Sequence, residues 1–218
     1  MNTPSAPARR SALRLLAAGL AGVAALASGF VAWALKRPDV TLARSTCSGG
    51  RPVNRRVLVA YATRAGSTSE VAQVVAERLC AQGFDAELRP VEAVAGVDGF
   101  QAVVLGSAVR YSAWLPEMLK FVESHRAALA NLPVAIFTTH MQALDDSEPS
   151  RKTRSSYSQA LRALIKPHDE AFFAGKVDPA TLSFFERWAV KMVKSPVGDK
   201  RDWGRIRAWA DGLGARLQ

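Results

Sequence analysis

Val57-Leu-Val-Ala-Tyr-Ala-Thr63-Arg-Ala-Gly66-Ser-Thr68-Ser-Glu-Val71 is the stretch of the sequence that decides the fold. Its apolar first half predicts a buried strand, and the part after Gly66 predicts an amphipathic helix. The first N–H groups of a helix have no partner within it, and the helix dipole is positive at that end. Because Thr63, Ser67 and Thr68 add hydroxyl donors, the loop suits a phosphate group.

The loop alone leaves a second interpretation open, since many strand-to-helix turns are rich in Gly and Ser for steric or capping reasons. Two nucleotide-binding motifs are excluded. No Lys follows Gly66 as a P-loop requires, and the sequence contains no G-x-G-x-x-G.

The net charge of +10 is concentrated near the start of the chain. Residues 1–56 hold nine Arg or Lys and one acidic residue, whereas the remainder holds 20 basic and 18 acidic residues. The basic excess flanks an apolar segment, which is typical of contact with anionic lipid. We therefore predict membrane lipid as a partner, and no nucleic acid.

Residues 15–35 form an uncharged run of 21 residues, long enough to cross a hydrocarbon core of roughly 30 Å. A cleavable signal peptide is the alternative, with the faintly twin-arginine pair Arg9-Arg10 and a cleavage site at 25–27. The run continues past that site to Lys36-Arg37, so we predict a transmembrane helix, or uncleaved signal anchor. The expected organisation is a basic N-terminal tail at 1–14, this helix at 15–35, a polar linker at 36–55 and a folded domain at 56–218.

The flank after the apolar run carries more Lys and Arg than the flank before it, so the positive-inside rule favours a cytoplasmic domain. We expect a single-pass protein of a bacterial-type inner membrane, with export to the periplasmic face as the alternative. Cys47 and Cys80 form no C-x-x-C pattern and, with three scattered histidines, no metal site. We predict that they are inert thiols.

Strand and helix patterns alternate from Arg56 onward, which predicts an α/β domain with a parallel sheet covered on both faces. The second strand alternates apolar and charged residues, which favours a place at an edge. Strands are expected at 57–61, 84–88, 102–106, 134–139 and 171–174, and helices at 67–82, 114–130, 153–165 and 202–217.

Ligands of such a sheet bind at the carboxyl ends of the strands. Three loops follow such ends, at 63–68, at 107–111 with Trp114, and at 138–141. They provide hydroxyls and backbone amides for a phosphate and aromatic faces for a flat ring. This combination suits FMN.

Three motifs resemble flavodoxin-domain proteins: Tyr-Ala-Thr-Arg-Ala-Gly-Ser-Thr at 61–68, Val-Leu-Gly-Ser-Ala-Val-Arg-Tyr at 104–111 and Phe-Phe-Ala-Gly at 172–175. With the segment 184–194, the chain is most similar to the flavodoxin-type, quinone-dependent protoporphyrinogen dehydrogenases. The resemblance runs from residue 56 to the C-terminus. It implies a flavodoxin-like three-layer sandwich, a five-stranded parallel sheet of order 2-1-3-4-5 and non-covalent FMN.

By position, the resemblance implies that the first loop holds the phosphate and that the other two flank the isoalloxazine ring. Ala65 departs from the family pattern, because flavodoxins often have a hydroxyl there, although its backbone N–H can still donate. The implied cofactor-binding residues are Thr63, Arg64, Ala65, Gly66, Ser67, Thr68, Ser107, Ala108, Val109, Arg110, Tyr111, Thr138, Thr139, His140 and Met141.

Three residues of these loops are candidates for a catalytic role. Arg110 either neutralises a reduced flavin or a propionate, or is a solvated charge. Of the aromatic residues Tyr111 and Trp114, one is expected to touch the ring and the other to pack, and Tyr111 matches the family motif better. His140 is either a proton shuttle or a satisfied loop histidine.

Residues 176–201 form a longer segment than is needed to connect the strand at 171–174 to the helix at 202–217. Apolar residues there fall near one helical face with basic residues interspersed, so the segment either packs on the domain or meets a membrane or an apolar substrate. The cluster Arg151-Lys152-Arg154 is either solvated or meets lipid or substrate carboxylates.

The expected function is that of a membrane-anchored FMN oxidoreductase in haem biosynthesis, with a porphyrinogen substrate and a membrane quinone as acceptor. An anchored electron-transfer flavodoxin without substrate chemistry, or a degenerate flavodoxin-fold binding module, stays open. A fold resemblance does not separate these functions.

Overall fold

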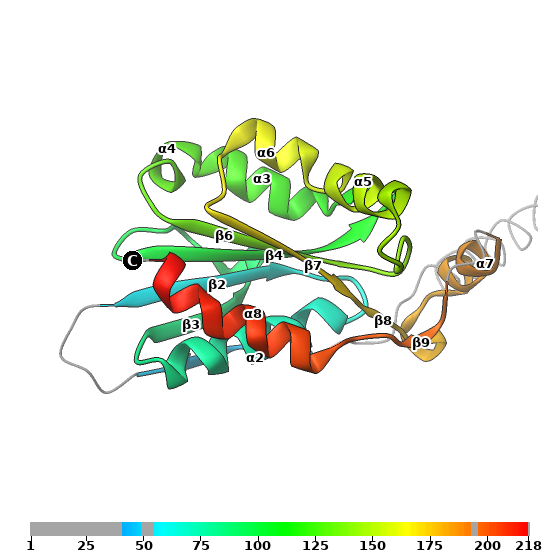
Figure 1. Cartoon of the computed structure of the whole chain (residues 1–218), viewed down its shortest axis with the longest axis horizontal. Helices are drawn as coiled ribbons and strands as arrows, with labels where there is room; N and C mark the ends of the chain where they lie inside the picture. The colour runs from blue at the N-terminus through cyan, green and yellow to red at the C-terminus, as the bar shows by residue number, and fades with distance from the viewer. Residues whose placement is uncertain (1–40, 49–54, 193–195, 218) are drawn as a thin grey trace, which may run out of the picture.

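The computed structural model describes residues 41–48, 55–192 and 196–217, and shows one sheet with helices on both faces (Figure 1). The strands of the sheet are β1 (Ser45–Cys47), β2 (Arg56–Ala62), β3 (Asp85–Pro90), β4 (Ala102–Arg110), β5 (Ala113–Trp114), β6 (Val134–His140) and β7 (Asp169–Ala174), and a separate pair is β8 (Lys176–Val177) with β9 (Gly198–Asp199). The helices are α2 (Ser67–Ala81), α3 (Pro116–Ser124), α4 (Arg126–Leu129), α5 (Glu148–Ser156), α6 (Gln159–Leu164), α7 (Phe184–Met192) and α8 (Trp203–Arg216), with 3-10 turns at Val91–Ala93 and Pro179–Thr181.

The five long strands run parallel in the order β3-β2-β4-β6-β7. Counted along the chain from β2, this is the order 2-1-3-4-5, so the predicted α/β sandwich with its parallel sheet is confirmed. β1 pairs antiparallel with the outer side of β3, where Ser45 lies opposite Leu88. The prediction that β3 is an edge strand is therefore wrong. The covering strand comes from the stretch assigned to the linker.

Both faces of the central strands are buried, which explains why β2 is apolar throughout. Val57, Val59 and Tyr61 belong to the core under α2 and α8, while Leu58 and Ala60 belong to the core under α3 and α6. Figure 1 shows α2 and α8 on one face of the sheet and α3 to α6 on the other.

Two of the predicted helices are divided. The helix expected at 114–130 is α3 followed by α4, with a break at His125, and Trp114 belongs to β5 instead. The helix expected at 153–165 is α5 followed by α6, and α5 begins early because the Ser147 hydroxyl caps it by accepting from Ser150 N.

Cys47 and Cys80 are joined by a disulfide, with their Cα atoms 6.2 Å apart. It ties β1 to the last turn of α2. The prediction of two inert thiols is wrong, because that prediction assumed that Cys47 lay in a linker away from the domain.

The predicted transmembrane helix at 15–35 and the basic tail at 1–14 lie outside the described residues. Within the residues that the structure describes, no helix combines the length and apolar character that crossing a bilayer requires.

Candidate functional site

A pocket of about 600 Å³ lies at the carboxyl ends of the parallel strands, where the loops after β2, β4, β6 and β7 meet. The predicted loops do come together there. Of the predicted cofactor-binding residues, those that line this pocket are Thr63, Arg64, Ala65, Ser67, Thr68, Ala108, Val109, Arg110, Tyr111, Thr139, His140 and Met141.

The loop between β2 and α2 has the geometry of an anion site. Gly66 is the N-cap of α2, adopts φ 85° and provides no side-chain cap, while its carbonyl oxygen accepts the first helical hydrogen bond from Glu70 N at 3.2 Å. The N–H groups that precede Glu70 in the helix therefore receive no cap from this residue. Thr63 Oγ1 accepts from Gly66 N at 3.1 Å and braces the turn. The N–H groups at the start of α2 are thus directed at an incoming anion.

The hydroxyls of this loop have partners in neighbouring elements. Ser67 Oγ accepts from Lys176 N at 2.9 Å, which leaves its own proton for an anion. Thr68 Oγ1 lies 2.6 Å from Thr139 Oγ1, so one of these hydroxyls donates to the other. These bonds fix the loop after β2 to β6 and to β8.

Gly66, Ser107 and Thr138 were predicted to bind the cofactor, but they are not among the residues that line the pocket. The Ser107 and Thr138 hydroxyls instead bond to neighbouring elements. Ser107 Oγ accepts from Leu115 N at 3.1 Å, and Thr138 Oγ1 accepts from Trp114 Nε1 at 2.9 Å. Both hydroxyls are fully buried, and Trp114 is 2% exposed. These contacts position the loop after β4, and Trp114 is a packing residue.

Tyr111 stands at the rim of the pocket and is 88% exposed. It and Ser112 both have a positive φ, 51° and 59°, which is strained for residues other than glycine. The guanidinium carbon of Arg110 lies 5.0 Å from the centre of the Tyr111 ring. The loop therefore presents an aromatic face and a positive charge together.

His140 ends β6 and is buried beside the pocket, with its ring centre 5.8 Å from that of Tyr157. Its Nδ1 lies 2.7 Å from Gln142 O. Burial lowers the pKa of His140 below its usual value, the bond to Gln142 opposes this, and the positive charges of Arg154 and Arg205 lower the pKa further. The imidazole is therefore neutral at pH 7.

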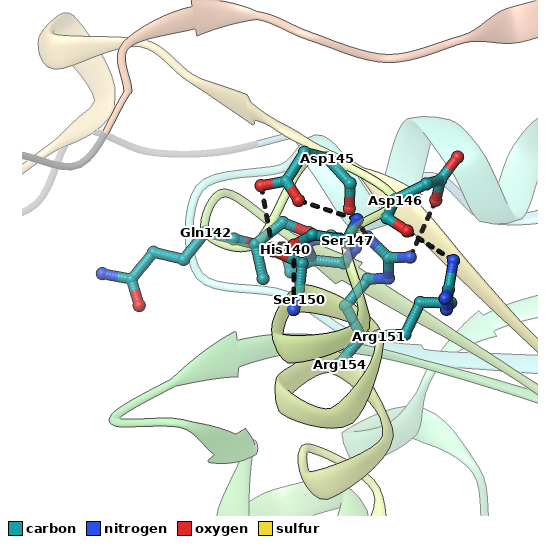
Figure 2. Close-up of polar contacts among 9 residues, drawn as sticks. His140, Gln142, Asp145, Asp146, Ser147, Ser150, Arg151 and Arg154 are labelled. Atoms are coloured by element: carbon teal, nitrogen blue, oxygen red, sulfur yellow. Dashed lines mark hydrogen bonds and ion pairs between the residues drawn. The ribbon is translucent and has the colours of Figure 1, made fainter.

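The loop after His140 is held by a buried arginine (Figure 2). Arg154 donates to Ala143 O at 2.8 Å and to the Asp146 carboxylate at 2.9 Å, and also to Asp145 O. Its side chain is only 9% exposed, so the prediction of a solvated or lipid-contacting Arg154 is wrong. In the same loop, hydrogen bonds from Ser147 and Ser150 lower the pKa of Asp145 to about 2.

Further residues line the pocket that the sequence analysis did not assign to it: Ser112, Leu115, Gln142, Tyr157, Gly175, Lys176, Val177, Leu182 and Val190. Gly175 follows the fifth parallel strand, so the rule that identified the other loops also applied to it. Tyr157 follows the last residue of α5, and its sequence neighbours give no sign of the site.

Comparisons with known proteins agree with this architecture. The family model described as "Flavodoxin domain" matches residues 58–203. The chain is 24% identical over 162 residues to "Protoporphyrinogen IX dehydrogenase [quinone]" of Escherichia coli K12, covering 72% of this chain and 88% of the relative. It is 23% identical over 178 residues to the protein of the same name from Leishmania major, covering 73% and 75%.

Among solved structures, the fold is similar to a short-chain flavodoxin associated with a bacterial microcompartment. The TM-score is 0.47 at 13% identity, covering 75% of this chain and 99% of that one. It is also similar to the flavodoxin of Streptococcus pneumonia TIGR4, with a TM-score of 0.45 at 15% identity, covering 74% and 99%.

Proposed function

Because the chain belongs to the flavodoxin-domain family, we propose that it is a membrane-anchored FMN oxidoreductase that oxidises a porphyrinogen and passes the electrons to a membrane quinone. FMN is the cofactor of the family, and oxidation and reduction are its chemistry. Both curated relatives carry the name of a quinone-dependent porphyrinogen dehydrogenase, which supports this choice of substrate and acceptor.

The residues of the pocket fit FMN. The uncapped start of α2 and the Ser67 and Thr68 hydroxyls suit a phosphate, while Tyr111 and the apolar wall suit a flat ring. A Cβ on Gly175 would lie 3.4 Å from Ser67 Oγ and 3.5 Å from His140 O, so the glycine keeps space beside the anion site. The pocket volume of about 600 Å³ lies in the usual range for cofactor sites.

The observation that carries the proposal is an apolar wall beside the cofactor pocket. The chain leaves β8, forms α7 and returns through β9, and this excursion places Val177, Leu182 and Val190 along the pocket. A connection that only joined β7 to α8 would not need this excursion. Bound FMN supplies the electron-accepting chemistry, and the wall gives an apolar substrate a surface next to the ring.

His140 is suited to receive a proton from the substrate. Gln142 O can only accept a hydrogen bond, so the Nδ1 of the neutral ring carries the proton and Nε2 is the free accepting atom. Arg110, on the pocket wall, places a positive charge where a substrate propionate can pair with it.

Porphyrin fluorescence growing from protoporphyrinogen, under exclusion of oxygen and with a quinone as acceptor, tests the proposal. The detergent-solubilised full chain should produce it. Val190→Asn, which puts an amide into the apolar wall, should raise KM at least about fivefold with FMN content unchanged, whereas Lys191→Asn on the adjacent exposed position should not. A yellow protein that forms no porphyrin with any quinone contradicts the proposal.

An electron-transfer flavodoxin is the second candidate. The exposed Tyr111 favours it, because an aromatic side chain open to solvent at the rim of the pocket suits contact with a redox partner. Rapid one-electron exchange with a redox protein, together with no porphyrin formation, would establish this role.

We further propose that the anchored domain faces the oxidising exterior of a bacterial-type inner membrane. The Cys47–Cys80 disulfide supports this, since disulfides persist in such compartments, and the Arg9-Arg10 pair agrees with export. The basic flank after the apolar run points the other way, but the charge difference is small. Alkaline phosphatase fused after Gln218 should be active, and a silent fusion would restore the cytoplasmic orientation.

A further inference from the structure

The chain enters the described domain at the edge of the sheet where the pocket opens. Ala43 N donates to Ser69 Oγ at 2.9 Å, in the first turn of α2, and the Tyr61 hydroxyl donates to Ala43 O at 2.8 Å, near the end of β2. β1 then runs antiparallel to β3, away from this edge. The first described segment therefore begins beside the phosphate loop.

The attachment leaves a short tether. Leu35, the last residue of the predicted anchor, is six residues before Thr41, and six extended residues span at most about 20 Å. A domain of this size is about 40 Å across, from a radius of gyration of about 16 Å. Without β1 and the Cys47–Cys80 disulfide, the whole segment from Lys36 to Arg55 would be a free linker, which could span about 70 Å when extended. A tether shorter than the domain keeps this edge toward the bilayer.

The exposed apolar side chains of the described residues gather at the same edge. They come from the first described segment, from the loops after β4 and β6, and from the excursion that holds α7, which stands out beyond the sheet in Figure 1. One exposed leucine is ordinary on a protein surface, but a gathering at one edge marks an interaction site. The large apolar side chains that are more than a third exposed are Leu42, Tyr111, Leu144, Trp188, Met192 and Val197.

Helix α7 has the composition of a helix at a membrane interface. Trp188 and Met192 lie one turn apart and are 59% and 64% exposed, and the exposed Arg187 and Lys191 lie one turn apart beside them. Residues 176–201 carry six basic and three acidic side chains. Aromatic and basic groups together favour the headgroup region of an anionic bilayer.

We propose that the carboxyl edge of the sheet, with α7 at its rim, rests on an anionic lipid bilayer, so that the pocket opens toward the membrane. Trp188 and Met192 enter the interface, and Arg187 and Lys191 meet lipid phosphates. An apolar substrate or quinone then passes between bilayer and pocket without crossing water. This orientation rests on the anchor of the proposed function.

Quenching of tryptophan fluorescence by brominated lipid tests the orientation. The full chain is reconstituted into phosphatidylglycerol–phosphatidylcholine vesicles with brominated or ordinary acyl chains, and is compared with Trp188→Phe. The other tryptophans contribute equally to both proteins, so the difference isolates Trp188. We expect at least half of the Trp188 emission to be quenched. A tryptophan placed at exposed Ala127, in α4 near the opposite edge of the sheet, should stay unquenched in the Trp188→Phe background.

A matched pair of insertions tests the tether. Twenty Gly/Ser residues inserted after Arg37 should lower the quenching of Trp188 at least twofold, whereas the same insertion after Gly50, between β1 and β2, should leave it unchanged. Equal quenching of the full chain and Trp188→Phe, in protein that resists alkaline carbonate extraction, overturns the orientation and leaves the anchor standing. Release of the protein by carbonate overturns both the orientation and the anchor. Porphyrin formation by the released protein then reports separately on the enzymatic part of the proposed function.

Discussion

Removal of the Cys47–Cys80 disulfide should destabilise the domain strongly. The bridge closes a loop with a sequence separation of 33 residues. In the chain-entropy account, freeing a loop of that length in the unfolded state costs about 4 kcal/mol of folding stability at 25 °C. In a domain of this size each kcal/mol shifts the melting temperature by about 2–4 °C, so the loss should be about 8–16 °C.

The assay is thermal unfolding of the detergent-solubilised full chain, followed by near-UV circular dichroism, for the Cys47→Ala/Cys80→Ala protein. Ser45→Ala, an exposed change in the same strand β1, is the matched control and should melt within about 2 °C of the unaltered chain. A reductant should lower the melting temperature of the unaltered chain and leave the double variant unaffected. A double variant that loses less than about 3 °C would refute the reasoning.

Three further substitutions test the site and the core. Gly175→Val should weaken FMN binding at least tenfold in fluorescence titrations of the apoprotein, because its methyl groups fill the space beside the phosphate loop; an unchanged Kd contradicts this. The lowered pKa of His140 means that, around and below pH 6.5, the unfolded chain binds more protons than the folded one, so stability decreases as the pH is lowered; in His140→Gln the loss of melting temperature between pH 7 and 5.5 should shrink, and an identical loss would show that this residue is not responsible. Gly106→Ala should cost about 1–3 kcal/mol in denaturant unfolding, since its Cβ would lie 2.0 Å from Phe137 Cζ, while Gly96→Ala, with its nearest contact at 3.6 Å, should be near neutral.

The sheet was predictable because its five parallel strands are encoded by local signals. Each is an apolar run followed by a loop and a helix, and this alternation fixes a parallel sheet with buried faces. The pairing of β1 with β3 carries no such signal, since Ser45 and Leu88 are far apart in sequence and the short segment is polar. The disulfide was missed for the same reason.

The candidate site was partly predictable, because a parallel sheet brings its strand-end loops to one edge wherever they lie in the sequence. The orientation of individual side chains was not. Ser107 and Thr138 turn inward to bond Leu115 and Trp114, and buried Arg154 holds the loop after β6. Such choices depend on distant partners that become neighbours only in the folded chain.

The FMN content of the purified full chain tests the cofactor pocket most directly. We expect a yellow protein that releases one FMN per chain on denaturation and regains its colour when the apoprotein is mixed with FMN. A colourless protein that takes up no FMN on reconstitution would contradict the assignment of the pocket.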